Sequence, residues 1–517
     1  MFEYGIMPPA MFLGMIIFML YGFPVAFSLS AVGLFFGLLG IATGHFDFGF
    51  MQALPLRIFG IVSNDLLLAI PFFTFMGAVL ERCGLAEDLL EGTGKLFGAI
   101  PGGLAYAVIL VGAILGAITG TVAASVITMG VISLPIMLKY GYNPRLATGV
   151  IAASGTITQV IPPSLVLIVL ADQLGRSVGD MYLGAIGPSI LQVVIFLLFI
   201  LAMSIFRPQD VPALPPEARG EMNMALVGRV LWGMVPSIVL IFLVLGTIFM
   251  GLATPTEAGA LGVVGAMVLA ALHGRLTWDL IRQGMHSTMT ITSMVVFILV
   301  GATCFSLVFQ GMDGGLWIEY LLKHVPGGVV GFLIFVNIFI FFLAFFLDFF
   351  EIAFIVLPML APVASALGID LIWFGVLLCV NMQTSFMHPP FGFALFYLRS
   401  IAPKTVKTRD IYIGAIPWLG MQLILVAIII FWPQSVTYWL DKAPDVDLNT
   451  IKIEVPGFGN GLGNGGNNNQ MPNFGLPSLD GIPGQGGNQP GQPAQPGQQA
   501  PGLPGMPNFG EPPKINP

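Results

Sequence analysis

The sequence predicts an all-α polytopic membrane protein made of two inverted repeats, each with a re-entrant helical hairpin and a broken helix. Of the 517 residues, 56% are hydrophobic and 9% are charged, and the mean hydropathy is +0.91. Soluble globular proteins have roughly 25% charged residues, so most of this chain is expected to lie in lipid. The second observation is that an interrupted apolar segment, 152–164, returns as 381–390, with Pro389 at the position that Pro162 has in the first copy.

Several apolar runs are long enough to cross a bilayer, which takes about 20 residues in a helix. They lie near 7–21, 24–43, 66–82, 181–205, 230–250, 255–272 and 287–310. Residues 1–4 carry no positive charge of the kind that opens a signal peptide, so the first run is expected to be a retained span. The segment 48–63 is semi-polar and suits the membrane interface. The segment 86–98 has the spacing of an amphipathic helix, so we expect it to lie along the membrane surface.

Two pairs of shorter apolar pieces predict re-entrant hairpins. The pairs are 103–118 with 122–138, and 328–346 with 352–366. Each piece of the first pair is marginal for a full crossing, and the two join at the turn signal Thr119-Gly120-Thr121. The second pair joins at 347–351, which contains Asp348 and Glu351. Irregular backbone at membrane depth is tolerated only where protein or a cavity surrounds it, so we expect these tips to be enclosed.

The Pro162-Pro163 pair interrupts the first of the two long apolar segments. Proline lacks a backbone donor and clashes with the preceding turn, so a membrane helix should break there and leave carbonyls without partners. Pro389-Pro390 interrupts the second segment in the same way. Interrupted segments at matching positions of two halves are the best sequence indication of the binding site of a secondary transporter.

Further matches support an internal repeat over 101–186 and 326–416. The matched pairs are Pro101-Gly102-Gly103 with Pro326-Gly327-Gly328, Pro135 with Pro362, Gly141 with Gly368, Ser154 with Asn381, and Tyr182–Ile186 with Tyr412–Ile416. Lys and Arg residues gather in alternate loops, which places the N-terminus outside by the positive-inside rule. With that orientation the two hairpins enter from opposite sides of the membrane, so the repeats are inverted.

The chain is expected to have six regions. They are N-terminal scaffold helices at 1–83, transport elements of the first repeat at 84–186, central scaffold helices at 187–310, transport elements of the second repeat at 311–416, a final transmembrane helix at 417–440, and a tail at 441–517. The tail is rich in Gly, Asn, Gln and Pro and cannot bury a core, so we expect it to be disordered and outside. It is expected to be a linker or solubilising segment, with docking of an external partner as the alternative.

Hydroxyl and amide side chains gather at both breaks and hairpin tips. In one interpretation the hydroxyls bond back to carbonyls of the preceding turn and bend the helix. In the other, hydroxyls and freed carbonyls form an oxygen cage for Na+. We favour the cage because the interruption occurs twice, each time with a polar hairpin tip. The candidate Na+ ligands are Thr119, Gly120, Thr121, Ser125, Ser154, Gly155, Thr156, Asp348, Asn381, Gln383, Thr384 and Ser385.

An anionic substrate is expected beside the cage, facing the N-terminus of the half-helix after each break. The candidate residues are Thr158, Pro162, Pro163, Ser164, Glu351, His388, Pro389 and Pro390. An unpaired carboxylate at mid-membrane costs about 3 kcal/mol on insertion scales, which makes Asp348 and Glu351 conspicuous. They form a solvated tip or share a proton, or else Asp348 is a cation ligand and Glu351 a gate or proton-linked group. His388 bonds either a substrate carboxylate or an intrahelical carbonyl.

Other features have structural explanations. Thr254-Pro255-Thr256-Glu257 opens a span with the spacing of a capping box, so Glu257 is expected to cap a helix. The three cysteines lack the spacing of disulfides or of a metal site, and we expect no cofactor and no transition metal. Ser154-Gly155 resembles the pair of intramembrane serine proteases, but its only distant base candidate is His388 and no oxyanion hole accompanies it. We therefore expect no enzyme activity. No Walker motif is present, so ATP is not the energy source.

Several short motifs are specific when taken together. They are Ile100-Pro101-Gly102-Gly103, Ile118-Thr119-Gly120-Thr121 leading to Ala123-Ala124-Ser125, Ala152-Ala153-Ser154-Gly155-Thr156 with Ile161-Pro162-Pro163-Ser164, Ala253-Thr254-Pro255-Thr256-Glu257-Ala258, Phe346-Leu347-Asp348 followed by Pro358, and His388-Pro389-Pro390-Phe391-Gly392. With these motifs, the chain from about residue 7 to residue 433 resembles the large permease (M) subunit of tripartite ATP-independent periplasmic (TRAP) transporters.

The resemblance implies Na+-coupled secondary uptake of an organic acid anion that a periplasmic substrate-binding protein delivers. It implies an inverted-repeat elevator-type transporter with two re-entrant helical hairpins and two broken helices, braced by a small four-helix TRAP membrane subunit. The expected location is the bacterial inner membrane, with multiple passes through the lipid bilayer, both termini periplasmic and no nucleic-acid partner.

Two departures from the family pattern bear on the substrate. Many relatives have Thr where His388 stands, and the tail at 441–517 lies outside the pattern. His388 and Glu351 look more like the branch that handles 2-oxo acids, lactate-like acids, or mannitol and chloroaromatic compounds than like the sialic-acid branch. The alternatives are a stand-alone Na+/dicarboxylate or citrate symporter of related fold without a binding protein and, in another class, an ion channel or a respiratory pump subunit.

Overall fold

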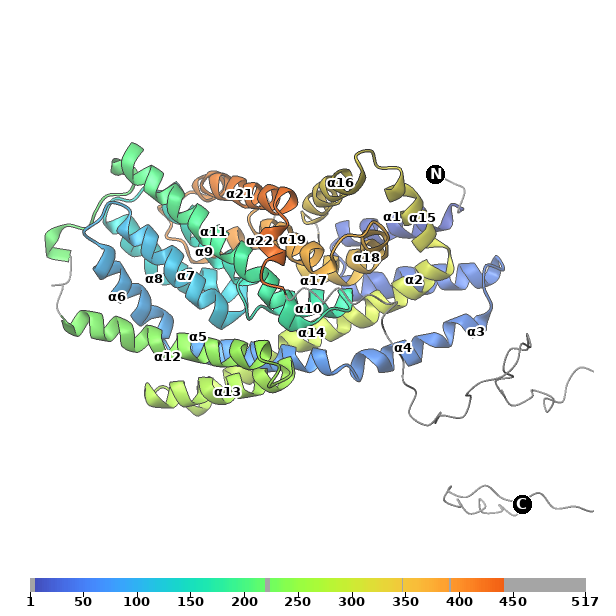
Figure 1. Cartoon of the computed structure of the whole chain (residues 1–517), viewed down its shortest axis with the longest axis horizontal. Coiled ribbons are helices and arrows are strands. Elements are labelled where there is room, and N and C mark those ends of the chain that lie inside the picture. The colour runs from blue at the N-terminus through green and yellow to red at the C-terminus, as the bar shows by residue number, and fades with distance from the viewer. Residues whose placement is uncertain (1–4, 219–223, 346, 390–391, 441–517) are drawn as a thin grey trace, which may run out of the picture. The chain divides into compact units, whose positions relative to one another are not determined.

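The computed structural model describes residues 5–218, 224–345, 347–389 and 392–440, and over these residues the chain is helical, without a β-strand (Figure 1). The prediction of an all-α chain is confirmed. The tail expected at 441–517 lies outside the described residues, as do Pro390 and the side chain of Thr119.

Many of the described helices are long and apolar enough to cross a membrane. By length and composition there are eight such spans in the described part of the chain, or up to ten if two bent pairs of helices each count as one. The eight are α2 (Val25–Ala42), α8 (Val122–Lys139), α11 (Val178–Phe206), Val230–Phe249 within α12 (Met224–Phe249), α13 (Pro255–Leu272), α14 (Trp278–Gly311), the segment Phe349–Ala366 and α21 (Thr408–Phe431). The protein is therefore a multi-pass membrane protein. The last of these helices begins at Thr408, ahead of the boundary expected at 417.

The N-terminal helices lie where the apolar runs predict them. Before and after α2 come α1 (Met7–Leu20), α3 (Phe48–Met51), α4 (Ala53–Val62), the 3₁₀ turn η1 (Asp65–Leu68) and α5 (Ala69–Arg82). The semi-polar segment forms α3 and α4, and the chain bends by 46° before α5. Asn64 caps the turn at this bend, because its side chain accepts a hydrogen bond from Leu66 N at 2.9 Å. The amphipathic helix α6 (Leu85–Phe97) follows and packs against α7 and α12.

The first hairpin consists of α7 (Gly103–Thr119) and α8, which pack against each other. α7 ends at Gly120, whose φ of +61° lies in the left-handed region. Glycine adopts this conformation without steric cost and commonly ends helices. The turn predicted at Thr119-Gly120-Thr121 is confirmed.

The second hairpin also has two helical limbs, and one of them is irregular. Its first limb is α16 (Gly328–Leu343), and its second runs through α17 (Phe349–Glu351), a π turn, η5 (Ile352–Val356), and α18 (Leu357–Ala366). Val122, where α8 begins, is separated from Phe349, where this limb begins, by the same offset that relates Pro162 to Pro389. A short helix that is not among the predicted elements, α15 (Gly314–Lys323), precedes the hairpin at an angle of 119° to α16.

Both predicted broken helices are present. The first is α9 (Pro144–Thr156), η2 (Ile157–Gln159) and α10 (Leu165–Leu174), and the second is α19 (Leu371–Gln383), η6 (Thr384–Phe386) and α20 (Phe393–Ile401). The bounds of α9 and η2 recur in α19 and η6 at this same offset. The local backbone thus follows the internal repeat of the sequence residue by residue up to each break.

The remaining short elements are η3 (Pro208–Asp210), η4 (Pro216–Ala218) and α22 (Gln434–Thr437). The long helix α14 packs along α2 and α5, and the crossing of α2 and α14 is very close: a Cβ built on Gly301 would lie 2.5 Å from the Ala26 carbonyl oxygen. Small residues permit such close packing between membrane helices. Figure 1 shows α12, α13 and α4 along one edge, whereas α9, α10 and α19 lie toward the middle. There α9 contacts α7, α8 and α21, and α19 contacts α10, α11, α16 and α21.

Candidate functional site

The first halves of the two broken helices meet at their ends. α9 ends at Thr156 and α19 at Gln383, and Gln383 Nε2 donates a hydrogen bond to Thr156 Oγ1 at 3.2 Å. Both side chains are fully buried. The two residues are 227 positions apart, the spacing that relates the repeats, so equivalent positions are in contact. A contact of this kind is expected where a pseudo-two-fold axis relates two repeats.

A third buried side chain reaches the same point. Gln422 of α21 donates from Nε2 to Thr156 Oγ1 at 3.0 Å. The Thr156 hydroxyl in turn donates to the Ala153 carbonyl at 2.8 Å. The amide oxygens of Gln383 and Gln422 are buried and have no partner within the described parts of the chain. Buried polar atoms nearly always have a partner, so these oxygens are available to a ligand or to ordered water.

At the first break, side chains form hydrogen bonds with backbone groups. Ser164 caps α10: its hydroxyl donates to the Gln159 carbonyl at 2.5 Å and accepts from Val166 N at 3.2 Å. Cys379 Sγ of α19 also lies 3.4 Å from the Gln159 carbonyl oxygen. The Ser164 hydroxyl, a candidate for substrate binding, is therefore engaged in the backbone of its own break.

The threonines and serines at the breaks differ in their bonding. Thr156, Thr158 and Thr384 each donate to a carbonyl three residues earlier in the chain, which is the bonding that bends a helix. The hydroxyl oxygens of Ser154 and Ser385 are buried without a partner among the described residues. The back-bonded interpretation holds for the threonines, and the two serines are the hydroxyls that remain available as ligands.

The first hairpin packs tightly on the first broken helix. A Cβ built on Gly112 of α7 would lie 2.8 Å from Ser154 Cβ, and one on Gly116 would lie 3.0 Å from Thr158 Cα. From α8, the Val126 side chain would clash with a Cβ built on Gly155. A Cβ at any of these three glycines would force its neighbour to move. The hairpin thus holds three of the predicted site residues against itself, and Ser125 of α8 is buried in the same interface region.

The second hairpin contacts the second broken helix through the side-chain amide of Asn381. Asn381 Nδ2 donates to the Asn337 carbonyl of α16 at 2.8 Å, and Asn337 Nδ2 donates to the Leu333 carbonyl at 2.8 Å. Asn337 Oδ1 is buried and has no partner in the described chain. Asn337 and Gln422 were not among the predicted site residues. The signal that could have found them is an uncharged amide within an apolar span, since polar groups in a membrane helix usually face the protein interior.

Asp348 and Glu351 form a capping box at the tip of the second hairpin. Phe349 N donates to Asp348 Oδ1 at 2.7 Å, and Asp348 N donates to Glu351 Oε2 at 3.0 Å. Thr254 and Glu257 form the capping box that the sequence predicts at the start of α13. The same three-residue spacing signals the cap at Asp348, and it explains why the second limb begins at Phe349 rather than at 352.

His388 is fully buried between two aromatic rings. Its ring centre lies 4.1 Å from that of Phe341, edge to face, and 4.5 Å from that of Phe345, stacked. Neither ring nitrogen has a partner among the residues the structure describes. The bond to an intrahelical carbonyl weighed for His388 is therefore not present in the described chain, and both nitrogens are available to another polar group.

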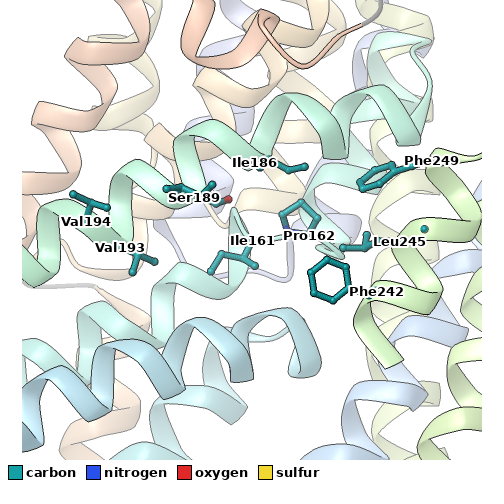
Figure 2. A pocket seen from close by; sticks show the side chains of 11 residues that line it. Ile161, Pro162, Ile186, Ser189, Val193, Val194, Phe242, Leu245 and Phe249 are labelled. Carbon is teal, nitrogen blue, oxygen red and sulfur yellow. The ribbon is translucent and has the colours of Figure 1, made fainter. Parts of the chain in front are cut away.

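An apolar cavity of about 460 Å³ lies beside Pro162, between the break, α11 and α12 (Figure 2). Among its lining residues only Ser189 has a polar side chain, and that hydroxyl donates to the Ala185 and Val160 carbonyls at 2.7 and 3.1 Å. A cavity with such a lining does not favour a carboxylate, because burying an unpaired charge is costly. The polar side chains that suit an ion lie instead where the ends of α9 and α19 meet.

The atoms that could coordinate an ion where α9 and α19 meet are hydroxyl and amide oxygens. Oxygen ligands of this kind suit hard cations rather than transition metals. Within the described residues, no group of three or more His, Cys, Asp or Glu side chains is arranged to hold a metal ion.

Comparison with solved structures supports the fold. The YdaH transporter of Alcanivorax borkumensis is similar with a TM-score of 0.53 at 16% identity, over 74% of this chain and 88% of that one. At this identity the similarity concerns the fold alone.

Comparison with known sequences identifies a family. The chain is 29% identical to the C4-dicarboxylate TRAP transporter large permease protein DctM of Pseudomonas aeruginosa, over 74% of this chain and 88% of the relative. It is 28% identical to the sialic acid TRAP transporter large permease protein SiaM of Vibrio cholerae, over 80% and 93%. Residues 12–435 match the family model described as "Tripartite ATP-independent periplasmic transporter, DctM component". The chain therefore belongs to the family of the DctM component, the large permease subunit, of tripartite ATP-independent periplasmic transporters.

Proposed function

We propose that this protein is the membrane permease for Na+-coupled uptake of an organic acid anion by an elevator mechanism. A periplasmic substrate-binding protein delivers the anion, and a small four-helix membrane subunit braces the scaffold. The observation that carries the proposal is the contact between Thr156 and Gln383. Two broken helices that meet at equivalent residues suit alternating access around a shared site.

The cation is held near the ends of α9 and α19. Ser154 and Ser385 supply hydroxyl oxygens that are buried and without a partner in the described chain. Asn381 belongs to the same segment, and its amide contacts the second hairpin. These are oxygen ligands of the hard type that alkali cations prefer. The tip carboxylate of Asp348 adds a negative charge that favours a cation.

The substrate is an organic acid anion of the 2-oxo or hydroxy acid type. The names of similar proteins specify C4-dicarboxylate, sialic acid and isethionate, which are all acids. Neither ring nitrogen of His388 has a hydrogen-bond partner among the described residues, so His388 is a hydrogen-bonding group for a carboxylate. Glu351 gates the site from the hairpin tip.

The protein lies in the bacterial inner membrane with both termini in the periplasm. The distribution of Lys and Arg along the sequence supports this orientation by the positive-inside rule. The driving force is sufficient. If two Na+ ions accompany a monovalent anion, one net charge enters, and the membrane potential contributes about 2.3 kcal/mol per 100 mV. That free energy supports roughly 40-fold accumulation.

Reconstitution into liposomes tests the proposal. The complex of both membrane subunits, with the cognate binding protein outside, should accumulate a carboxylic acid only when an inward Na+ gradient is imposed. The acid is first identified by a thermal-shift screen of the binding protein. Uptake that is indifferent to the Na+ gradient would contradict the coupling, and uptake that needs no binding protein would favour a stand-alone symporter. Current without substrate counterflow would indicate a channel.

A further inference from the structure

Gln192 is a buried glutamine of α11 that is not part of the proposed site. Its side chain is only 1% exposed, and neither Nε2 nor Oε1 has a partner among the described residues. Leaving both ends of a buried amide unbonded is costly. Such a side chain is expected to find a partner in some state of the protein.

The internal repeat identifies the residue equivalent to Gln192. The segment Tyr182–Ile186 matches Tyr412–Ile416, and the offset between these two segments also relates Gln192 to Gln422. Both glutamines are buried. The repeat therefore contains one glutamine on each of the helices that follow the broken segments, α11 and α21.

The packing of these helices obeys the same equivalence. A Cβ built on Gly414 of α21 would clash with the carbonyl oxygen of Arg145 in α9. Its equivalent, Gly184 of α11, faces Ile372 of α19, with a Cβ 3.1 Å from Ile372 Cγ2. Arg145 and Ile372 are themselves equivalent, because each is the second residue of its half-helix, α9 or α19. Hence α11 contacts α19 through positions equivalent to those by which α21 contacts α9, although α11 lies less closely against its partner.

This equivalence assigns a partner to Gln192. Gln422 donates to Thr156 at 3.0 Å, and the equivalents of Gln422 and Thr156 are Gln192 and Gln383. Gln383 Oε1 is a buried acceptor that is unbonded within the described residues, and Gln192 Nε2 is a donor in the same condition. The structure contains the contact between Gln422 and Thr156. It does not contain the equivalent contact between Gln192 and Gln383, but the donor and the acceptor for that contact are both unbonded among the described residues.

We propose that Gln192 is a positioning residue that donates to Gln383 Oε1 when a cation engages the second broken helix. Gln383 lies between Asn381 and Ser385, two of the candidate cation ligands, so a cation that draws their oxygens inward reorients the backbone that carries Gln383. Gln192 then holds the end of α19 as Gln422 holds the end of α9. Both breaks are fixed in one geometry, which links cation binding in the second repeat to the first.

This inference rests on the proposed Na+ coupling, and a double-mutant cycle tests it on the purified complex of the full-length chain with its membrane partner. The variants are Gln192→Met, Gln383→Met and the double variant, because methionine keeps the volume and removes the amide. The readout is the Na+ concentration that gives half of the Na+-induced rise in Tm. Loss of one hydrogen bond made only in the cation-bound state should raise this midpoint roughly three- to tenfold.

The double variant should shift the midpoint no more than Gln383→Met alone, because Gln383→Met already removes the bond to Gln192 together with the bond to Thr156. Gln192→Asn, which keeps the amide but shortens its reach, should shift it in the same direction if Gln192→Met fails to fold. Ser204→Ala removes a hydroxyl elsewhere on α11 that bonds the Pro101 carbonyl, and its midpoint should match the wild type. If Gln192→Met leaves the Na+ midpoint unchanged, or if the fold-change of the double variant equals the product of the two single fold-changes, the proposed contact is wrong. The proposed Na+ coupling is not affected by either result. A wild-type Tm that ignores Na+ would overturn the proposed function and this contact together.

Discussion

Thr156 and Gln383 occupy the same position in the two repeats and are hydrogen-bonded to each other, with Gln383 Nε2 3.2 Å from Thr156 Oγ1. The two helix breaks are therefore in direct contact with each other. A disturbance at either break reaches the other through this bond.

Thr156→Val should destabilise the protein more than an ordinary buried threonine change. The valine keeps the shape but removes the acceptor for both Gln383 and Gln422. Each amide that loses a buried partner costs about 1–3 kcal/mol, so a loss of roughly 2–6 kcal/mol is expected. Thermal denaturation of the purified protein measures it. Thr148→Val is the matched control, because among the described residues its buried hydroxyl bonds only the Pro144 and Arg145 carbonyls of its own helix. Equal losses in the two variants would refute the special role of Thr156.

Ser154→Ala should raise the Na+ concentration needed for half-maximal uptake and leave the folded protein intact. The Ser154 hydroxyl oxygen has no partner among the described residues, so its removal breaks no internal hydrogen bond. Loss of one oxygen ligand should weaken Na+ binding by about tenfold, the equivalent of about 1.4 kcal/mol. Uptake into liposomes at graded Na+ concentrations provides the measurement. Ser435→Ala, which removes a buried hydroxyl that bonds the Trp432 carbonyl, should show the wild-type Na+ dependence.

Asp348→Asn separates the two roles of the hairpin tip. Asparagine is as good an N-cap as aspartate, so the Tm should stay near that of the wild type. Asp348→Ala removes the cap and should cost about 1 kcal/mol of stability. If the carboxylate also attracts the cation, both variants lose Na+ dependence of uptake. Full Na+ dependence in Asp348→Asn would leave Asp348 with a capping role only. Glu257→Gln, in the other capping box, controls for changes to a box elsewhere.

Gly112→Ala should disturb the contact between the first hairpin and the first broken helix. The added Cβ would lie 2.8 Å from Ser154 Cβ and 3.1 Å from the Ser154 carbonyl oxygen, so one helix must shift. Overpacking of this kind costs about 1–3 kcal/mol, and we expect weaker Na+ dependence as well because Ser154 moves. Gly420→Ala is the control, since a Cβ there meets no atom within 4 Å. A Gly112→Ala protein as stable and as Na+-dependent as the Gly420→Ala protein would contradict the close packing.

Much of the fold follows from local features of the sequence. Apolar runs of sufficient length predict the spans, and Gly120 predicts the turn of the first hairpin because glycine adopts positive φ at no cost. Pro162 breaks its helix because proline lacks a backbone donor. The offset between the repeats can be read from paired residues such as Pro135 and Pro362, and the helix bounds reproduce it.

The candidate site was only partly predictable. The sequence indicated that polar groups near Ser154 and Asn381 lie at two breaks, since this follows from composition and order alone. It did not indicate that Thr384 bonds back to Asn381, because a threonine in a bent helix can turn either way. The three-residue spacing of Asp348 and Glu351 is that of a capping box, whereas a carboxylate expected at membrane depth also predicts an ion ligand. The structure shows the capping box.

By itself, the sequence determined that this is a membrane protein of two repeats, each with a break and a hairpin, because these depend on residues near one another in the chain. Only the tertiary structure decided that Thr156 meets Gln383, that Gln422 joins them and that Asn337 holds Asn381. These contacts join residues far apart in the chain. The packing of whole helices determines which of them meet, and no local rule of sequence encodes that choice.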